Sequence, residues 1–395
     1  MKRILFLSFY FRPDLCAGSF RNSPLLEELS RKTRDKNIRI DVFTTQPNRY
    51  ASFNRDAPQV YEFDNVRIER INIPPHEGGI IDQAFSFRTF FFKTLQKTKN
   101  KRYDLVYGSS SRFFTSYLAY RIAKKNKCPL YLDVRDIFSE TLSGVSKNPF
   151  TKYLIIPVIR TLENRVYNHS RHINLISKGF ESSFNRYKKK TFSYFTHGID
   201  PIFLVKATLT IPKKKSSKKT ILYAGNIGEG QGLHKIIPTT AKLLETTHQF
   251  EIIGEGGAMD KLMKSLKDLD VQNVNLRKPV ERKDLVNEYH TADYLFLHLN
   301  NYEIFKKVLP SKIFELASTD KPILAGVDGF AAEFLRLHVP NSYVFKPGDY
   351  LHLLSLIDKI GTIKSSDPER LQNFKQEFNL RKINSEMAAS ILHYL

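Results

Sequence analysis

The stretch Val308-Leu-Pro-Ser-Lys-Ile-Phe-Glu-Leu-Ala-Ser-Thr-Asp-Lys-Pro-Ile-Leu-Ala325 predicts a loop, a helix, a tight turn and a buried strand in succession. Ser311 has the side chain of a helix N-cap. Lys312 and Glu315 share one face of the predicted helix at its N-terminal end, where unpaired N–H groups favour anions. A cation and a carboxylate there suit a ligand with phosphate oxygens and hydroxyls, such as a sugar nucleotide. A capped surface helix with a Lys–Glu ion pair explains the same residues equally well.

Short apolar runs alternate with longer helical patterns along the whole chain. In the first half the pattern predicts strands at residues 4–8, 38–44, 66–73, 105–108, 130–134, 172–176 and 192–195. In the second half it predicts strands at residues 220–224, 250–253, 271–276, 294–297, 322–325 and 342–345. Continuous apolar strands separated by helices indicate parallel sheets covered on both faces. The predicted fold class is α/β, with two doubly wound domains facing a central cleft, where such sheets bind ligands.

The division between the two predicted domains is placed after residue 198. This gives domains at residues 1–198 and 199–375, and a C-terminal helix at about 376–395 is expected to pack back onto the first domain. A lysine-rich segment, residues 206–219, interrupts the alternation of strands and helices. We interpret this segment as a solvated linker or flap.

Composition limits the classes of protein that fit. The 62 Lys and Arg outnumber the 40 Asp and Glu and give a formal net charge of +22, which predicts an anionic partner such as a membrane surface, a nucleic acid or a phosphorylated substrate. Only two cysteines occur, Cys16 and Cys128, so neither a disulfide framework nor a cysteine-rich zinc site is supported. No apolar run is long enough to predict a membrane-spanning helix.

Glycines cluster in two loops that follow predicted strands of the second domain. Gly225, Gly228, Gly230 and Gly232 lie between a strand and a helix, where backbone N–H groups can approach a diphosphate. The spacing does not match the dinucleotide fingerprint, and an ordinary flexible loop is the alternative. A second turn begins at Gly254 and resembles in position the wall of a nucleotide pocket, although a simple turn explains it as well. In the first domain, Gly18 is a weaker signal of the same kind.

A pair of carboxylates follows a predicted buried strand of the first domain. Asp133, Arg135 and Asp136 come at the end of the strand at 130–134, so their polar groups are expected at the cleft edge, where they could bind sugar hydroxyls. A structural Arg–Asp pair is the alternative. The histidines are scattered and show no metal-ligand spacing, so no metal site is predicted.

The segment at residues 85–102 mixes phenylalanines with basic residues. Its members are Phe85, Phe87, Phe90, Phe91, Phe92, Arg88, Lys93, Lys97, Lys99, Lys101 and Arg102. As a helix it would present an aromatic patch beside a basic one, which suits an anionic membrane surface. A core helix whose phenylalanines face their own sheet is the alternative.

Taken together, these segments resemble the GT-B glycosyltransferases, specifically the retaining enzymes of the family 4 type. The resemblance covers nearly the whole chain and rests on an ordered set: Ala17-Gly-Ser19, Leu162-Glu163 before Ile176-Ser177, Thr196-His-Gly-Ile-Asp200, Tyr223-Ala-Gly-Asn226, Ile253-Gly-Glu-Gly256 and Pro310-Ser-Lys-Ile-Phe-Glu315 followed by Lys321-Pro-Ile323. Within this group the chain is similar to a branch that builds bacterial surface polysaccharides, including L-fucosamine transferases of O-antigen clusters.

The resemblance implies a role for each part of the predicted site. Glu315 would accept hydrogen bonds from the nucleotide's ribose hydroxyls, Lys312 would neutralise the leaving diphosphate, and the glycine loop would contact the diphosphate through backbone N–H groups. The implied donor-binding residues are Gly18, Gly225, Asn226, Gly228, Gly230, Gln231, Gly254, Arg277, Lys307, Ser311, Lys312 and Glu315. The implied catalytic residues are Asp133, Asp136, Lys312 and Glu315.

The chain departs from the family pattern at charged positions. Many relatives carry a carboxylate eight residues before the position of Glu315, where this chain has Lys307. Many carry Arg and Lys around the glycine loop, where this chain has Asn226 and Gln231. Lys307, Lys312 and Arg277 therefore remain three candidates for the charge on the diphosphate.

The resemblance implies an enzyme that transfers a sugar from a UDP-sugar and retains its anomeric configuration. By similarity to the branch that builds surface polysaccharides, the sugar is expected to be an N-acetylated 6-deoxyhexosamine. The expected acceptor is linked to a lipid, undecaprenyl diphosphate, in O-antigen or capsule biosynthesis. No cofactor, no metal ion and no nucleic acid is expected. We expect a cytoplasmic protein, peripheral at the inner face of the cytoplasmic membrane through residues 85–102. The alternatives are a GT-B UDP-sugar epimerase and a non-enzymatic protein that binds anionic surfaces.

Overall fold

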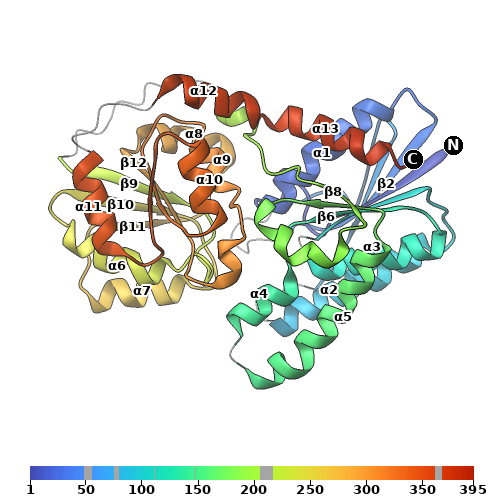
Figure 1. Ribbon diagram of the computed structural model, residues 1–395, viewed down its shortest axis with the longest axis horizontal. Coiled ribbons are helices and arrows are strands. Elements are labelled where there is room, and N and C mark those ends of the chain that lie inside the picture. Colours follow the sequence, from blue (N-terminus) through green and yellow to red (C-terminus); the bar gives the residue numbers. More distant parts are fainter. Residues whose placement is uncertain (49–55, 75–79, 111, 147, 205–216, 361–366) are drawn as a thin grey trace. The chain divides into compact units, whose positions relative to one another are not determined.

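The computed structural model describes residues 1–48, 56–74, 80–110, 112–146, 148–204, 217–360 and 367–395, with the backbone alone for residues 80–84. The chain divides into two compact units, one made of Met1–His197 with Arg381–Leu395 and the other of Gly198–Leu380 (Figure 1). The division predicted after residue 198 and the observed one differ by one residue. Most of the lysine-rich segment at 206–219 lies outside the described residues.

The first unit is built on an eight-stranded sheet with the strand order β3-β4-β2-β1-β5-β6-β7-β8. Its strands are β1 (Lys2–Leu7), β2 (Ile38–Thr45), β3 (Val60–Phe63), β4 (Val66–Ile71), β5 (Leu105–Ser109), β6 (Leu130–Val134), β7 (His172–Leu175) and β8 (Thr191–Ser193). All neighbours pair in parallel except β3, which pairs antiparallel with β4 at the edge. The sequence pattern missed β3 because its side chains are mostly exposed and polar and apolar residues are mixed in it.

The helical elements of the first unit lie in the connections between these strands and in the C-terminal tail. They are α1 (Ala17–Thr33), α2 (Ile80–Thr98), α3 (Phe113–Asn126), α4 (Phe138–Val145), the π-helical turn η1 (Thr151–Ile155), α5 (Ile156–His169), the 3₁₀ segment η2 (Lys178–Tyr187) and α13 (Leu380–Leu392). From α13, Met387 and Ile391 are fully buried in the same cluster as Leu25 and Leu29 of α1 and Phe6 of β1. The C-terminal helix therefore completes the core of the first unit.

The second unit is built on a six-stranded parallel sheet with the order β11-β10-β9-β12-β13-β14. Its strands are β9 (Lys219–Ala224), β10 (His248–Ile253), β11 (Val274–Arg277), β12 (Tyr294–His298), β13 (Ile323–Gly326) and β14 (Ser342–Phe345). Its helices are η3 (Pro201–Phe203), α6 (Leu233–Leu243), α7 (Met259–Asp268), α8 (Arg282–Thr291), η4 (Glu303–Lys306), α9 (Lys312–Leu316), α10 (Phe330–His338), α11 (Tyr350–Ile360) and α12 (Pro368–Glu377).

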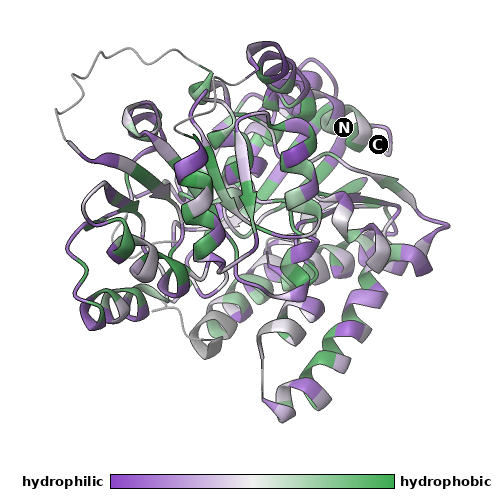
Figure 2. Cartoon of the chain, turned by 60° about the vertical axis from the view of Figure 1, so that its left-hand side comes forward, coloured by the Kyte–Doolittle hydropathy of each residue, from purple (hydrophilic) through white to green (hydrophobic). Residues whose placement is uncertain are grey.

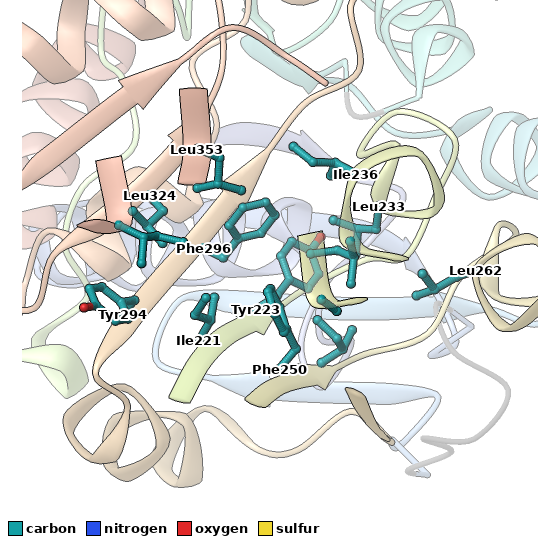
Figure 3. Packing of buried hydrophobic residues seen from close by; sticks show 14 of the residues in the cluster. Ile221, Tyr223, Leu233, Ile236, Phe250, Leu262, Tyr294, Phe296, Leu324 and Leu353 are labelled. Atoms are coloured by element: carbon teal, nitrogen blue, oxygen red, sulfur yellow. The ribbon is translucent and has the colours of Figure 1, made fainter. Parts of the chain in front are cut away.

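The core of the second unit explains why its strands are nearly continuous runs of apolar residues. Tyr223, Phe250 and Phe296 of three neighbouring strands pack with Ile236 of α6 and Leu353 of α11 in one buried cluster (Figure 3). Strands covered by helices bury both faces, so their sequences lack the alternation of a half-exposed strand. The prediction of two doubly wound α/β domains is confirmed.

The strand order of the second unit determines where a ligand can bind. β9 lies between β10 and β12, and the order of the strands reverses between β9 and β12. At such a reversal the loops that follow the two strands leave a crevice at the carboxyl ends of the strands. The loop at residues 225–232 follows β9 and the segment at residues 299–311 follows β12, so both sequence motifs of the second domain reach this point.

Candidate functional site

The side chains of Lys312 and Glu315 come together with two residues of helix α8. Lys312 Nζ donates to Glu315 Oε2 over 2.6 Å and to the hydroxyl of Tyr289 over 3.3 Å. Tyr289 donates to the same carboxylate oxygen over 3.2 Å, and Arg282 Nη2 lies 3.5 Å from the other oxygen, Oε1. Arg282 also pairs with Asp200 over 2.6 Å. A helix and a segment that follow different strands thus meet in one hydrogen-bonded group.

This group is charged although it is largely enclosed. Burial favours the neutral carboxylic acid, but Lys312 and Arg282 outweigh it and hold the pKa of Glu315 below its ordinary value. Burial likewise opposes the charge of Lys312, but Glu315 and Tyr289 outweigh it and raise the pKa of Lys312. Burial raises the pKa of Tyr289 to about 12, so its hydroxyl stays a hydrogen-bond donor at neutral pH. The Lys312 side chain is 27% exposed and that of Glu315 is 6% exposed, so the lysine is the more accessible member of the pair.

The helix that carries this pair is shorter than predicted, and the capping prediction is wrong. The helix α9 covers Lys312–Leu316, whereas the sequence predicted it to continue to residue 318. Ser311 has helical backbone angles and its side chain makes no capping hydrogen bond. A helix of little more than one turn has a small dipole, so the side chains, and not the helix terminus, give this site its charge.

The glycine loop lies beside Lys312. A Cβ atom added at Gly225 would stand 3.7 Å from Lys312 Cε, and one added at Gly230 would stand 3.1 Å from the Phe305 ring of η4. The loop therefore contacts the segment that follows β12, as the strand order requires. Of the predicted loop residues, Gly225 and Gly230 lie at these contacts.

The hydrogen bonds of the loop correct the predicted use of its backbone. The N–H of Gly225 donates to Ile253 O, and the N–H of Gly228 donates to Oε1 of Gln231. Gln231 also accepts from the side-chain amide of Asn226 over 2.9 Å. Gln231 and Asn226 thus organise the loop from within, and the N–H groups of Gly225 and Gly228 serve the fold. In the structure these two N–H groups are used within the protein, and the diphosphate contact predicted for the backbone of residues 225–232 stays a prediction for the rest of the loop.

Gly254 is required where two loops cross. Its φ is +153°, and a Cβ atom there would stand 1.8 Å from the carbonyl oxygen of Gly225. The two glycine turns predicted as ligand walls therefore pack directly against each other. Gly254 has a structural reason to be glycine that does not involve a ligand.

We expect Gly254→Ala to lower the free energy of unfolding of the second unit by at least ~2 kcal/mol, because the backbone of the Gly225 loop must move. Gly257→Ala is the matched control, since an added Cβ at Gly257 meets nothing within 4 Å. Urea unfolding of both variants measures the difference. Equal midpoints for Gly254→Ala and the wild type would show that the two loops do not cross this closely.

His298 forms hydrogen bonds with the backbone of the glycine loop and with the backbone of Gly348. Its Nδ1–H donates to Gln231 O over 2.6 Å, and its Nε2 accepts the N–H of Gly348 over 3.0 Å. These two partners require the neutral ring. Burial lowers the pKa of His298 from 6.5 to about 4, in agreement with that requirement.

His298→Phe should destabilise the second unit by about 2 kcal/mol at pH 7.5, since a carbonyl and an N–H lose their partners. Between pH 6.5 and 4 the unfolded chain binds a proton at His298 and the folded chain does not, so the histidine's contribution to stability falls as the pH is lowered. The difference in urea midpoint between wild type and variant should therefore shrink from pH 7.5 to pH 5. A difference that grows on acidification would contradict the assigned neutral state.

Arg277 and Lys307 were the other candidates for the charge on a diphosphate. Arg277 forms two hydrogen bonds with the carboxylate of Glu288, over 2.6 Å and 2.9 Å, and lies 3.9 Å from Glu251. Its charge is neutralised by these two acids, which argues against the predicted role. Lys307 follows η4 at the crevice end of β12 and stays a candidate beside Lys312.

Asp133 does not line a cleft edge. Its side chain is fully buried, and its two oxygens accept from Arg21 Nε over 2.7 Å and Nη2 over 2.8 Å. Asn174 and the Tyr107 hydroxyl donate to the same carboxylate. The opposing charge of Arg21 overcomes burial and lowers the pKa of Asp133. Asp133 is a structural carboxylate, and its predicted contact with sugar hydroxyls is wrong.

Asp136 and Gly18 have different surroundings from those predicted. Asp136 is half-buried, accepts from Thr141 Oγ1 over 2.6 Å and has a pKa raised by burial. It precedes α4 and remains a candidate for substrate contact. Gly18 lies in the first turn of α1 and not in the loop before it.

The guanidinium of Arg135 has two buried nitrogens, Nε and Nη1, that form no hydrogen bond within the described part of the chain.

Tyr289, Arg282 and Asp200 were missed by sequence reasoning. Tyr289 and Arg282 come from a helix with a mostly polar sequence, and Asp200 comes from the segment that begins the second unit. Each contacts the site from 23 or more residues away along the chain, and no short motif joins them. A three-dimensional structure was needed to find them.

Across the described residues, no group of three or more His, Cys, Asp or Glu is arranged to hold a metal ion. The same residues contain no helix long and apolar enough to span a membrane.

Comparison with known proteins gives a family match for most of the second unit. Residues 207–378 match the family described as glycosyl transferases group 1. Over 97 residues the chain is 32% identical to a protein of Escherichia coli (strain K12) named as a colanic acid biosynthesis glycosyl transferase, WcaI. That match covers 25% of this chain and 24% of WcaI. The match to the group 1 glycosyl transferases thus lies within the second unit, and the WcaI match spans about a quarter of either chain.

Solved structures with the same fold cover the whole chain. Sucrose-phosphate synthase from Thermosynechococcus elongatus matches with a TM-score of 0.75 at 13% identity, over 100% of this chain and 99% of that one. Anabaena HepE in complex with UDP matches with a TM-score of 0.69 at 16% identity, over 100% of both chains. WaaG, a glycosyltransferase involved in lipopolysaccharide biosynthesis, matches with a TM-score of 0.68 at 12% identity, over 98% of this chain and 99% of that one. The GT-B fold is confirmed.

Proposed function

We propose that this protein is a retaining glycosyltransferase that moves a sugar from a UDP-sugar to a lipid-linked acceptor during the synthesis of a bacterial surface polysaccharide. The observation that carries the proposal is the buried group of Glu315, Lys312 and Tyr289 beside Gly225, at the crevice between β9 and β12. It stands in a domain that matches group 1 glycosyl transferases. The similar fold of HepE, solved with UDP, favours a uridine nucleotide as the donor.

The hydrogen-bonding capacity of the site fits a nucleotide sugar. A carboxylate offers about four lone-pair positions, and among the described residues Glu315 Oε1 has only the long contact with Arg282. In the proposal this oxygen accepts the ribose hydroxyls. An ammonium has three N–H groups, and Lys312 uses two of them on Glu315 and Tyr289. Its third N–H is directed to a diphosphate oxygen.

The charges of the group do not by themselves favour a diphosphate. Lys312 is balanced by Glu315, and Arg282 is balanced by Asp200. In the proposal Lys307 supplies the additional positive charge, and the leaving UDP needs no metal ion because cationic side chains stabilise it. The bond from the sugar's anomeric carbon to UDP breaks, and the acceptor oxygen bonds to that carbon on the same face. The acceptor's proton passes to the departing phosphate oxygen.

In this proposal the first unit contacts both the acceptor and the membrane. Within residues 85–102, Phe85 and Phe92 are more than half exposed, and Arg88 and Lys93 are exposed beside them. Phe90 is fully buried and packs on Phe9, so the segment serves both the core and the surface. The exposed part favours a peripheral position at the inner face of the cytoplasmic membrane, where an undecaprenyl diphosphate acceptor is reached. The choice of an N-acetylated 6-deoxyhexosamine rests on the resemblance of residues 225–232 and 133–136 to transferases of that sugar.

The test is transfer by the purified protein. It is incubated with UDP-, GDP- and dTDP-sugars, including UDP-N-acetyl-L-fucosamine, with and without an undecaprenyl diphosphate-linked acceptor. We expect a glycosylated lipid and UDP from the UDP-sugar alone among these donors, with the anomeric configuration retained by NMR. A changed sugar nucleotide formed without acceptor would establish the epimerase instead. Turnover of GDP- or dTDP-sugars in preference to UDP-sugars would overturn the choice of donor.

A further inference from the structure

Helix α5 and the π-helical turn η1 before it carry an apolar surface that the core of the first unit does not use. Phe150, Tyr153, Leu154, Ile155 and Val158 are between 36% and 75% exposed. They follow one another at spacings of three, one, one and three residues. The sequence pattern at residues 152–168 predicts a helix but gives no sign of this exposure.

The opposite side of the same helical segment is already buried. Ile156, Ile159, Val166 and Tyr167 are 5% exposed or less, and Glu163 accepts hydrogen bonds from the backbone and side chain of Ser139 in α4. The helix is thus held against the unit by one face, while its N-terminal half also carries exposed apolar side chains on the other face. A group of exposed apolar side chains marks a surface that contacts a partner or a membrane.

Aromatic side chains, some of them exposed, also connect α4 with helices α3 and α2. Phe138 of α4 lies 6.5 Å from Phe114 of α3, and Phe114 lies 5.3 Å from Phe87 of α2, measured between ring centroids. Phe114 is 37% exposed, and Phe85 of α2 is more exposed still. In Figure 1 the labels of α2, α3, α4 and α5 lie together in the first unit, and Figure 2 shows hydrophobic stretches on helices that also carry hydrophilic residues.

This apolar surface is set in a strongly basic part of the chain. Residues 83–162 contain 15 Lys and Arg but 4 Asp and Glu, a net charge of +11 out of the chain's +22. No acid occurs between residues 141 and 162, where Lys152 and Arg160 are exposed beside the apolar side chains. Lys152 Nζ stands 5.7 Å from the Tyr153 ring centroid. Apolar side chains ringed by cations complement a bilayer whose surface is anionic.

We propose that the α4–η1–α5 hairpin, made of the described residues 138–146 and 148–169, docks the first unit on an anionic lipid bilayer. Phe150, Tyr153, Leu154 and Val158 enter the interface, and Lys152 and Arg160 contact the headgroups. This deepens the proposed function, from which it takes the membrane as partner, and assigns the deepest contact to a hairpin outside residues 85–102. Binding to lipid requires neither donor nor acceptor, so it is measured independently of glycosyl transfer.

The experiment is co-sedimentation of the full-length protein with vesicles. One set contains phosphatidylcholine alone and the other contains phosphatidylcholine and phosphatidylglycerol in equal parts. The test variant combines Tyr153→Ser, Leu154→Ser and Val158→Ser. The matched control combines Leu243→Ser, Leu337→Ser and Leu351→Ser, which are 57%, 69% and 65% exposed in the second unit. Thermal unfolding of both variants checks that they fold.

We expect the wild type and the control to bind the anionic vesicles alike, and the hairpin variant to bind them about tenfold more weakly or worse. Wild-type binding should fall on neutral vesicles and in high salt. Equal binding by a folded hairpin variant would overturn the proposal. A second result would also overturn it: the wild type is a dimer in gel filtration, and the hairpin substitutions convert it to a monomer without changing lipid binding. The apolar surface would then contact a second copy of the chain. If transfer to any acceptor fails while the lipid result holds, the glycosyltransferase proposal fails and the docking surface stands.

Discussion

Glu315→Gln should weaken the binding of UDP by about tenfold or more and slow sugar transfer by about a hundredfold or more, because a hydrogen-bonded charge at the ribose is lost. The substitution keeps the size of the side chain and removes its charge. Titration calorimetry with UDP and the initial rate of transfer measure the two effects. Glu303→Gln is the control, since Glu303 lies in the nearby η4 with an 85% exposed side chain and should change neither quantity. Wild-type values of both for Glu315→Gln would remove this residue from the donor site.

The same substitution also affects folding, and the two effects can be separated. Glu315→Gln leaves Lys312 without its carboxylate in a largely enclosed position, which is expected to cost about 3 kcal/mol of stability. Combining it with Lys312→Met removes the uncompensated charge while Arg282 keeps Asp200. We therefore expect the double variant to recover most of the stability and none of the UDP affinity. Recovery of both would mean that the pair is structural and that the nucleotide binds elsewhere.

Asp133→Asn should destabilise the first unit by about 3–5 kcal/mol, because it leaves the buried Arg21 guanidinium without a countercharge. The new amide would also place donor hydrogens toward Arg21 or Asn174, which already donate to this side chain. The urea midpoint of the first unit measures the loss. Arg21→Met combined with Asp133→Leu should be more stable than Asp133→Asn, since apolar pairs can replace buried ion pairs.

This result separates a structural carboxylate from a catalytic one. If Asp133 contacted the acceptor sugar, Asp133→Asn would unfold at the wild-type urea concentration and lose transfer activity. That outcome would contradict the buried position of the side chain. Asp136→Asn is the companion variant: its carboxylate is half-buried and accepts a hydrogen bond from Thr141, and among the described residues no buried cation is paired with it, so a smaller loss of stability than for Asp133→Asn is expected.

Much of the fold could be predicted from the sequence because its strands are buried on both faces. Apolar runs such as those of β9 and β12 stand out against the helices between them, whatever the partners of each strand. The edge strand β3 could not be predicted in this way, since its exposed residues have no apolar pattern. The exposed side of η1 and α5 was also beyond prediction, because an apolar residue has the same letter whether it faces the core or the solvent.

The sequence was sufficient to predict those parts of the candidate site whose residues lie close together along the chain. Lys312 and Glu315 lie one helical turn apart and could be paired from their spacing. Asp133 could not be classified, because a carboxylate at a strand end is equally compatible with solvent and with a buried arginine, and Arg21 is 112 residues away. The glycines had two explanations, a ligand or a close approach of backbones, and at Gly254 the close approach to the backbone of Gly225 favours the second.

The central claim is that the group of Glu315, Lys312 and Tyr289 beside the glycine loop holds the nucleotide of the donor. Calorimetric titration of UDP into the Lys312→Met, Glu315→Gln double variant tests it most directly, because that variant is expected to be folded. The account predicts binding of UDP by the wild type and no measurable heat of binding for the double variant, whose melting temperature should lie close to that of the wild type. A double variant that binds UDP with the affinity of the wild type would contradict it.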